Sequence, residues 1–249
     1  MVTKQRPLSL GKRPIVDAVF EIRVRSHLPL SSVLPGIIYT SLKADGIEQT
    51  PAMQIPKQVR DLQPELAFAP LFRISWGQHW VFVGDNVLSI SSKLPYSGWG
   101  AFRQAIQEVL SVVCTDQYIS AVDRCSMKYI DLIQTGDELD RREIFDLELS
   151  IGGKYPGREG YQVRVEFVEH GIHHVVQVVS HANLELINIG PVQGAVFDAD
   201  LVLPVSAEPP SIFIEALDLR LENLHTAIKD VFFDSLTDKG LEWLEPNYA

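Results

Sequence analysis

Residues 16–25 read Val-Asp-Ala-Val-Phe-Glu-Ile-Arg-Val-Arg, and the alternation in this run decides the fold class. Apolar and charged side chains occupy alternate positions: Ala18, Phe20, Ile22 and Val24 against Glu21, Arg23 and Arg25. Successive side chains of a β-strand point to opposite faces, so this run predicts a strand with one buried face and one polar face. Pro14 ends an extended N-terminal arm just before it.

A helix is predicted downstream of this strand at 31–44, where apolar residues recur at helical spacing. Ser31 or Ser32 can cap its N-terminus, and Gly46 can end it. Pro35 is compatible with this helix only in the first turn, because proline lacks a backbone N–H.

The rest of the first half predicts a loop, a meander and a second helix. Residues 47–67 contain three prolines and weak periodicity, which favours a loop or short irregular strands. Three short strands separated by turn residues predict an antiparallel meander at 71–76, 80–84 and 87–91. An amphipathic helix is expected at 99–114.

The second half repeats this order of elements. A strand at 122–134 is followed by a short helical segment at 141–145. Further strands are expected at 161–169, 172–180, 184–189 and 195–205. A long amphipathic helix starts between 212 and 215 and reaches 235, and a terminal helix is capped by Thr237.

The sequence therefore predicts an α+β protein with two similar halves, each reading strand, helix, antiparallel strands, helix. The halves are residues 1–120, with the N-terminal arm, and 121–249, with the long helix. The shared order suggests an internal duplication that forms one continuous curved antiparallel sheet with helices on one face. TATA-box-binding-protein-like and helix-grip folds have this layout, a likeness of shape that carries no function.

Composition limits the function classes. The chain has 249 residues, 46% of them hydrophobic, and a net charge of −10, which argues against non-specific nucleic-acid binding. Residues 1–14 are basic without an apolar core, and no run approaches about 18 apolar residues. We expect no secretory signal, no membrane span and a cytoplasmic location. Cys114 and Cys125 predict buried free thiols.

No motif predicts a cofactor or a metal site. The glycine-containing runs at 98–100 and 152–157 match neither a P-loop nor a dinucleotide fingerprint. Four histidines lie within twelve residues, namely His170, His173, His174 and His181. Their spacing matches no set of four ligands that closes a zinc site. They predict a polar strand face, on which adjacent side chains point to opposite sides.

A charged sheet face is the best candidate site. Glu21 and Arg23 share the outer face of the first strand, and Arg124 and Lys128 share one face of the matching strand in the second half. If the halves are pseudo-symmetric, these two strands occupy equivalent positions near the middle of the joint sheet, and Arg23, Arg124 and Lys128 form a basic patch opposite the helices. This patch could receive an anionic small ligand or an acidic partner surface. Alternatively, the cations pair with carboxylates on neighbouring strands, namely Glu21, Asp198 and Asp200.

Two further groups could carry chemistry. Asp198 and Asp200 share one face of a strand, so they could bind a divalent metal, act as an acid/base pair, or face water and pair with cations. His225 lies beside the apolar stripe of the long helix, where we expect a boundary histidine satisfied by a carboxylate.

Four segments carry a resemblance: residues 14–23, 124–131, 197–200 and 221–238. They read as a Pro-Ile-Val-Asp-Ala-Val-Phe-Glu-Ile-Arg strand, an Arg…Lys-Tyr-Ile-Asp strand, a Phe-Asp-Ala-Asp strand and a Leu-His…Phe…Leu-Thr-Asp helix. They resemble a sporadically distributed family of bacterial and archaeal proteins that has no established activity. Asp17, Lys128 and Asp131 stand where that family usually has Glu, Arg and Asn. The resemblance adds Tyr129 and His225 to the candidate residues and implies an association with anti-phage defence or toxin–antitoxin-like systems.

Two functions follow as hypotheses. The first is a non-enzymatic binding module that holds a protein partner or an anionic small ligand on the charged face. The second is a hydrolase or nuclease-like enzyme that uses Asp198 and Asp200 with a divalent metal, with His225 as a base. A homodimer with a structural role is a third reading.

Overall fold

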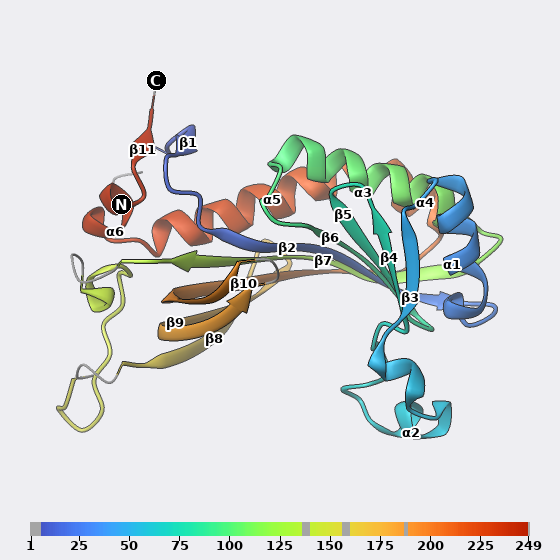
Figure 1. Cartoon of the computed structure of the whole chain (residues 1–249), viewed down its shortest axis with the longest axis horizontal. Helices are drawn as coiled ribbons and strands as arrows, with labels where there is room; N and C mark the ends of the chain where they lie inside the picture. The colour runs from blue at the N-terminus through green and yellow to red at the C-terminus, as the bar shows by residue number, and fades with distance from the viewer. Residues whose placement is uncertain (1–5, 136–139, 156–159, 187–188, 249) are drawn as a thin grey trace.

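Nine antiparallel strands form one continuous sheet in the computed structural model, which describes residues 6–135, 140–155, 160–186 and 189–248 (Figure 1). The strands are β2 (Ile15–Ser26), β3 (Gly46–Gln49), β4 (Phe72–Trp76), β5 (His79–Val83), β6 (Val87–Ser92), β7 (Ile119–Ile133), β8 (Gln162–Glu169), β9 (Ile172–Leu186) and β10 (Gly190–Glu208). Their spatial order is β3-β4-β5-β6-β2-β7-β10-β9-β8. A small second sheet pairs β1 (Ser9–Leu10) with β11 (Pro246–Asn247).

The centre of the sheet is the antiparallel pair β2 and β7. Phe20 lies opposite Met127, and Arg23 lies opposite Arg124. Within this sheet, the strands from the first half of the chain lie on the β2 side, and those from the second half lie on the β7 side. The predicted α+β class and the continuous antiparallel sheet are confirmed.

Six α-helices accompany the sheet in the described part of the chain: α1 (Leu30–Ser41), α2 (Lys57–Leu62), α3 (Trp99–Val113), α4 (Pro210–Glu215), α5 (Leu217–Asp234) and α6 (Asp238–Trp243). In Figure 1, α3 and α5 run along one side of the sheet, and α2 lies on the other side. The predicted placement of all helices on one face is therefore wrong for α2.

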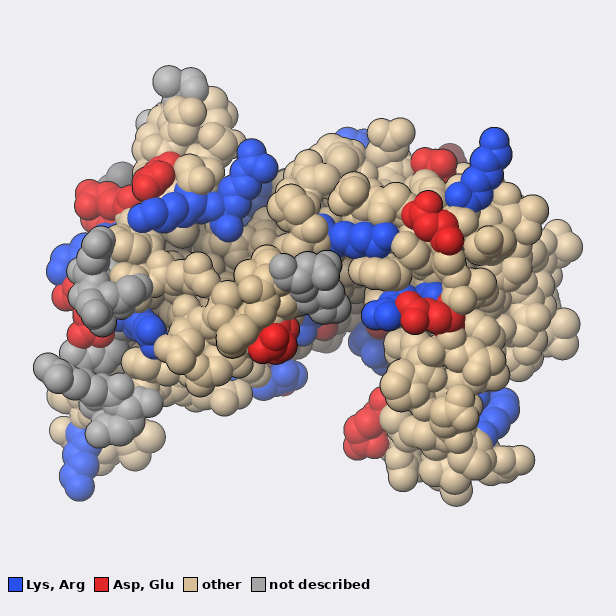
Figure 2. Space-filling view, viewed as in Figure 1, with Lys and Arg blue, Asp and Glu red and all other residues tan. Residues whose placement is uncertain are grey.

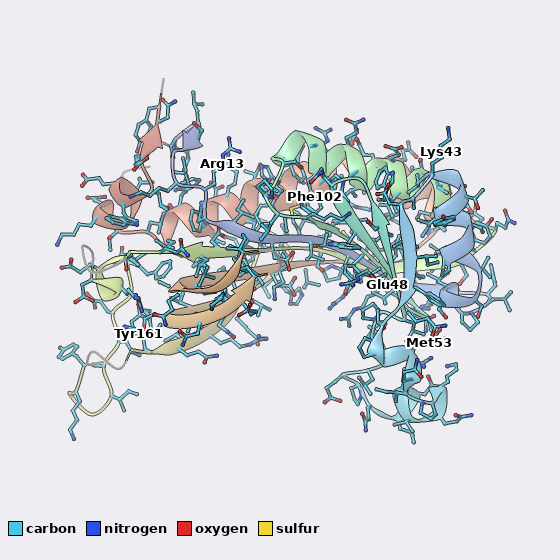
Figure 3. All side chains as sticks on the ribbon, in the orientation of Figure 1. Arg13, Lys43, Glu48, Met53, Phe102 and Tyr161 are labelled. Carbon is cyan, nitrogen blue, oxygen red and sulfur yellow. The ribbon has the colours of Figure 1, made fainter. Side chains whose placement is uncertain are left out.

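The core lies between the sheet and the helices on the α3 and α5 side. Phe20 from β2, Phe102 from α3 and Phe197 from β10 are fully buried in one apolar cluster with Phe213 of α4 and Leu221 of α5. Figure 3 places Phe102 between its helix and the strands. Burial of alternate residues along β2 confirms the alternation predicted for residues 16–25.

Helix α1 differs from its prediction at both ends. It follows Pro29, and neither Ser31 nor Ser32 makes a capping bond within the described structure, because the Ser31 hydroxyl donates to Asp85 instead. Pro35 lies beyond the first turn and is buried. The chain leaves the helix through Lys43, whose φ of 52° is left-handed, so Gly46 does not end the helix but begins β3.

The segment predicted as a loop at 47–67 is more ordered than its prolines suggest. It contains the end of β3, the 3₁₀ helix η1 (Pro51–Gln54) and α2. Pro51 occupies the first position of η1, where its missing N–H has no helical partner to lose. Buried Arg60 anchors this α2 lobe, because it donates to the Ile55 carbonyl at 2.7 Å and pairs with Asp85 at 3.2 Å.

The second half differs from its prediction in the length of several elements. The strands expected at 172–180 and 184–189 are one strand, β9, and the long helix is interrupted at Ala216 between α4 and α5. A three-residue 3₁₀ helix, η2 (Arg141–Glu143), stands where the first half has α1. The duplication and the division at residue 120 therefore stay predictions. Thr237 caps α6 by accepting from the Gly240 N–H, as predicted.

Several predictions fall partly outside the described residues: the arm at 1–5, the end of the glycine run at 156–157, and positions 187–188. Within the described part of that run, an Ile151–Lys154 bridge closes a tight turn.

Strand β10 passes close to the backbone of β7 at a glycine. A Cβ on Gly194 would lie 2.6 Å from the Ile133 carbonyl oxygen, next to a register shift in β10. We therefore expect Gly194→Ala to lower the free energy of unfolding by about 1–3 kcal/mol, measured by chemical denaturation. Gly36→Ala is the control, because the space around Gly36 in α1 is open in the described structure. It should stabilise by about 0.5–1 kcal/mol. Equal stability of the Gly194 variant and the wild type would contradict this close approach.

Candidate functional site

Six of the eight predicted site residues lie together on the sheet face opposite the α3–α5 layer. We call this set the charged face: Glu21 and Arg23 of β2, Arg124 and Lys128 of β7, and Asp198 and Asp200 of β10. They meet because β2, β7 and β10 are adjacent strands and their inward neighbours, such as Met127, fill the core. Lys128 lies directly opposite Asp200 in the β7–β10 register.

Ion pairs cross the charged face. The Glu21 carboxylate lies 2.9 Å from Arg23 Nε and 3.3 Å from Arg124 Nη2. Lys128 Nζ lies 2.9 Å from Asp198 Oδ2. The cations therefore form no unpaired basic patch, and the ion-pairing alternative left open by the sequence is the arrangement found. These side chains are 22–35% exposed, so each pair contributes at most about 1 kcal/mol.

A small pocket of about 240 Å³ opens on the charged face. Its walls include Arg124, Lys128, Asp198 and Asp200, together with Arg164 from β8. Arg124 Nε and Asp200 Oδ1 are buried and have no hydrogen-bond partner among the described residues. Burial raises the pKa of Asp200, and the charges of Lys128 and Arg124 oppose that rise. The side chains that carry this unused donor and this unused acceptor therefore line the same pocket.

The surroundings form a hollow around the charged face. The Arg23 guanidinium lies 4.0 Å from the ring centre of Phe68, so the chain that returns from α2 borders one side. Figure 2 shows the molecule hollowed between the lobe that carries α2 and the body of the protein, with acidic and basic side chains along the border. A partner that enters this hollow would meet charges of both signs.

The other two predicted residues, Tyr129 and His225, lie on the opposite side of the sheet. The Tyr129 hydroxyl is 3.2 Å from His225 Nδ1 and 3.2 Å from the Tyr96 hydroxyl. The Trp99 ring stacks on the His225 ring with 4.1 Å between centroids. The prediction that a carboxylate satisfies His225 is wrong, because its side-chain partner is a tyrosine. Burial lowers the pKa of His225 to about 4, so the ring is neutral at pH 7.

Asp131 is a buried acid that sequence reasoning left without a role. Asp131 lies opposite Ile15 of β2 and Phe197 of β10 on the helix side of β7, and only 4% of its surface is exposed to solvent. Burial, with a further contribution from the Asp198 charge, raises its pKa to about 8. The signal in the sequence is that Tyr129 and Asp131 are two positions apart, which places both on one face of the strand.

A metal site or a cysteine nucleophile would require particular side-chain arrangements among the described residues. No group of three or more His, Cys, Asp or Glu side chains there could hold a metal ion. Cys114 and Cys125 are buried, as predicted, and burial raises the pKa of each thiol to about 12. His173 is exposed whereas His174 is buried against the Phe167 ring, so the two point to opposite faces as predicted.

The fold and the site define an α+β protein with a charged, open sheet face. In comparisons with known proteins, the sequence matches no protein-family model and no curated protein. Within the described residues, no helix has the length and apolar character required to cross a bilayer.

Asp131 makes stability depend on pH. An unfolded aspartate has a pKa near 3.9, so between about pH 4 and pH 8 the folded state holds a proton that the unfolded state releases. Stability is therefore lost as pH rises through this range. Asp131→Asn should remove the part of this loss that Asp131 causes and raise the free energy of unfolding at pH 8 by roughly 2–5 kcal/mol, with little change at pH 4.

Urea denaturation at pH 4, 6 and 8 checks this expectation. Asp146→Asn is the control, because that side chain is exposed. A gain for Asp131→Asn that is the same at every pH would show that Asp131 is ionised in the fold.

Proposed function

We propose that the protein is a non-enzymatic binding module whose charged face holds a segment of a protein partner. The observation that carries this proposal is that two side chains lining one pocket each carry a buried polar atom without a partner among the described residues, namely Arg124 Nε and Asp200 Oδ1. A buried polar atom without a partner costs about 1–3 kcal/mol, so a ligand that satisfies both atoms recovers free energy on binding.

A peptide group matches this pair of atoms. Its carbonyl oxygen can accept from Arg124 Nε while an N–H donates to Asp200 Oδ1. A small anion could also accept from Arg124, but it would approach the carboxylates of Glu21, Asp198 and Asp200. The three cations and three carboxylates of the charged face balance, which favours a neutral polar group over a fully charged one.

The size of the pocket points in the same direction. Sites for small molecules usually enclose about 300–1,000 Å³, and this pocket has about 240 Å³. It has room for one side chain or a short turn of a larger partner, whose remaining surface would fill the hollow beside the α2 lobe. The resemblance to the sporadically distributed family supports a role for this module in a defence or toxin–antitoxin-like system.

A divalent metal on Asp198 and Asp200 is the competing proposal. The Lys128 ammonium group already lies 2.9 Å from Asp198, so a metal there would have to displace a bound cation. The geometry therefore favours the binding module.

The test compares tagged proteins purified from the native host. Arg124→Gln combined with Asp200→Asn removes the donor Nε–H of Arg124 and the charge of Asp200 while keeping similar shapes. We expect this variant to recover at least tenfold less of the co-purified partner than the wild type, by quantitative mass spectrometry. Thermal melting establishes that the variant is folded.

Arg25→Gln is the matched control, because Arg25 lies on the same strand as Arg23 but outside the charged face, with a side chain that is 64% exposed. Its recovery should equal that of the wild type. Equal recovery by the double variant would refute the proposed site. A co-purified small anion that the double variant loses would replace the partner segment as the ligand.

A further inference from the structure

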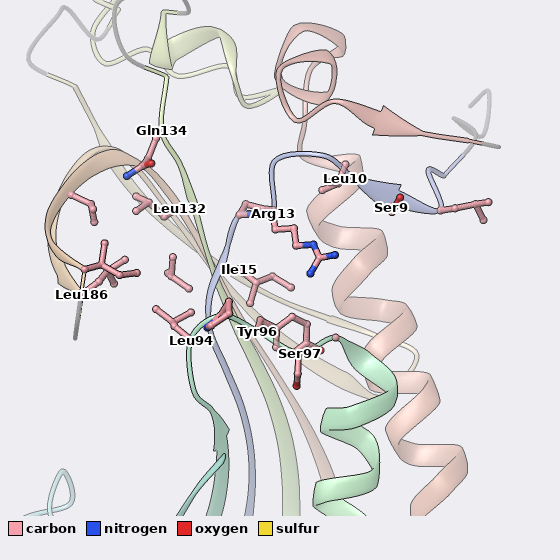
Figure 4. Close-up of a pocket in the computed structure, with 17 residues that line it drawn as sticks. Ser9, Leu10, Arg13, Ile15, Leu94, Tyr96, Ser97, Leu132, Gln134 and Leu186 are labelled. Carbon is pink, nitrogen blue, oxygen red and sulfur yellow. The ribbon is translucent and has the colours of Figure 1, made fainter. Parts of the chain in front are cut away.

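A second and larger pocket, of about 800 Å³, lies at the other end of the central strands (Figure 4). It is bounded by the N-terminal arm that leads into β2, the segment that follows β6, the end of β7 and the β9–β10 hairpin. Its walls include Arg13, Ile15, Leu94, Tyr96 and Leu132. Its volume lies within the range of about 300–1,000 Å³ that small-molecule sites occupy.

Arg13 gives this pocket its charge. It is the only charged side chain among the described residues that line the pocket, which include no Asp or Glu. The other described arm cations have partners: Arg6 pairs with Asp234 at 2.7 Å, and Lys12 pairs with Glu245 at 3.5 Å. Across the described chain, no hydrogen bond or ion pair engages the Arg13 side chain. An unpaired guanidinium in a pocket without carboxylates, on a chain of net charge −10, selects an anion.

The rest of the pocket wall is mostly apolar. Figure 4 shows the Arg13 guanidinium on the side of α5, whereas Leu94, Leu132 and Leu186 lie on the side of the β9–β10 hairpin. Val192 of the hairpin completes this apolar wall. The pocket therefore has a cationic end and a hydrocarbon end, which is the complement of an amphiphile with an anionic head.

Tyr96 is part of the pocket wall and is held by its neighbours. Its hydroxyl is held by Tyr129, which in turn contacts His225, and its ring packs edge-on against Phe102 with 6.2 Å between centroids. A wall that is fixed before a ligand arrives loses little conformational entropy on binding. The Tyr129–His225 pair, which lies apart from the charged face, thus acts as a support for this pocket.

We infer that this pocket binds an amphiphilic carboxylic acid, with the carboxylate on Arg13 and the hydrocarbon chain against Ile15, Leu94, Leu132 and Val192. The planar guanidinium can donate two parallel hydrogen bonds to a carboxylate. Burial of the chain against the leucines removes apolar surface from water and adds to the affinity. This site is independent of the charged face, so its test leaves the proposed partner site unaffected.

The experiment uses dodecanoate as the probe, below its micelle concentration, in isothermal titration calorimetry with the full-length chain. We expect saturable binding of one dodecanoate, and Arg13→Gln should weaken it about tenfold, the loss expected for one charge-assisted contact. Arg25→Gln removes the same charge from an exposed arginine at the far end of β2 and should leave the affinity unchanged.

Two further probes separate charge selection from simple hydrophobic adsorption. Dodecyltrimethylammonium, with the opposite charge, should not bind, and acetate, without the chain, should bind far more weakly than dodecanoate. Leu132→Asn should also weaken dodecanoate binding, and thermal melting shows whether this variant is folded. The inference is overturned if dodecanoate does not bind, if Arg13→Gln binds it as tightly as the wild type, or if the cationic amphiphile binds equally well.

Discussion

The pairing of β2 with β7 is the interaction on which the rest of the structure depends. It joins the strands of the two halves into one sheet, and its register fixes what each face of that sheet presents. Phe20 and Met127 meet on the side of the helices, whereas Arg23 and Arg124 meet on the open side. A slip of one residue would turn the charged side chains into the core, so burial of the apolar set specifies the register strongly.

This register also places charged polar groups on one face of the sheet and neutral polar groups on the other. The open side carries ion pairs that remain partly solvated, with Lys128 held to Asp198. The helix side carries neutral, buried groups, because burial raises the pKa of Asp131 and lowers that of His225. The Asp198 charge raises the pKa of Asp131 through the sheet. The two sides are therefore electrostatically linked.

Local patterns in the sequence predict the elements but not the contacts between distant segments. Alternation identifies β2, and helical spacing identifies α3 and α5, because these signals lie within one run of residues. The α2 lobe depends on the contact between Arg60 and Asp85, which are 25 positions apart. Its prolines favour a loop prediction, although the segment contains regular helices. The candidate residues of the charged face were predictable from alternation, whereas their ion pairs require a register between distant strands. The larger pocket combines four separate segments, and no local pattern signals it.

The central pairing has a consequence for the order in which the chain folds. Glu21 and Arg124 are 103 positions apart, whereas β6, the other neighbour of β2, is complete at Ser92. During synthesis the first half can therefore form its own sheet while one edge of β2 still lacks its neighbour. Such an unpaired edge is open to pairing with the same edge of another nascent chain until β7 emerges. Translation of the segment between β6 and the end of β7 is thus one interval in which the growing chain exposes an open strand edge.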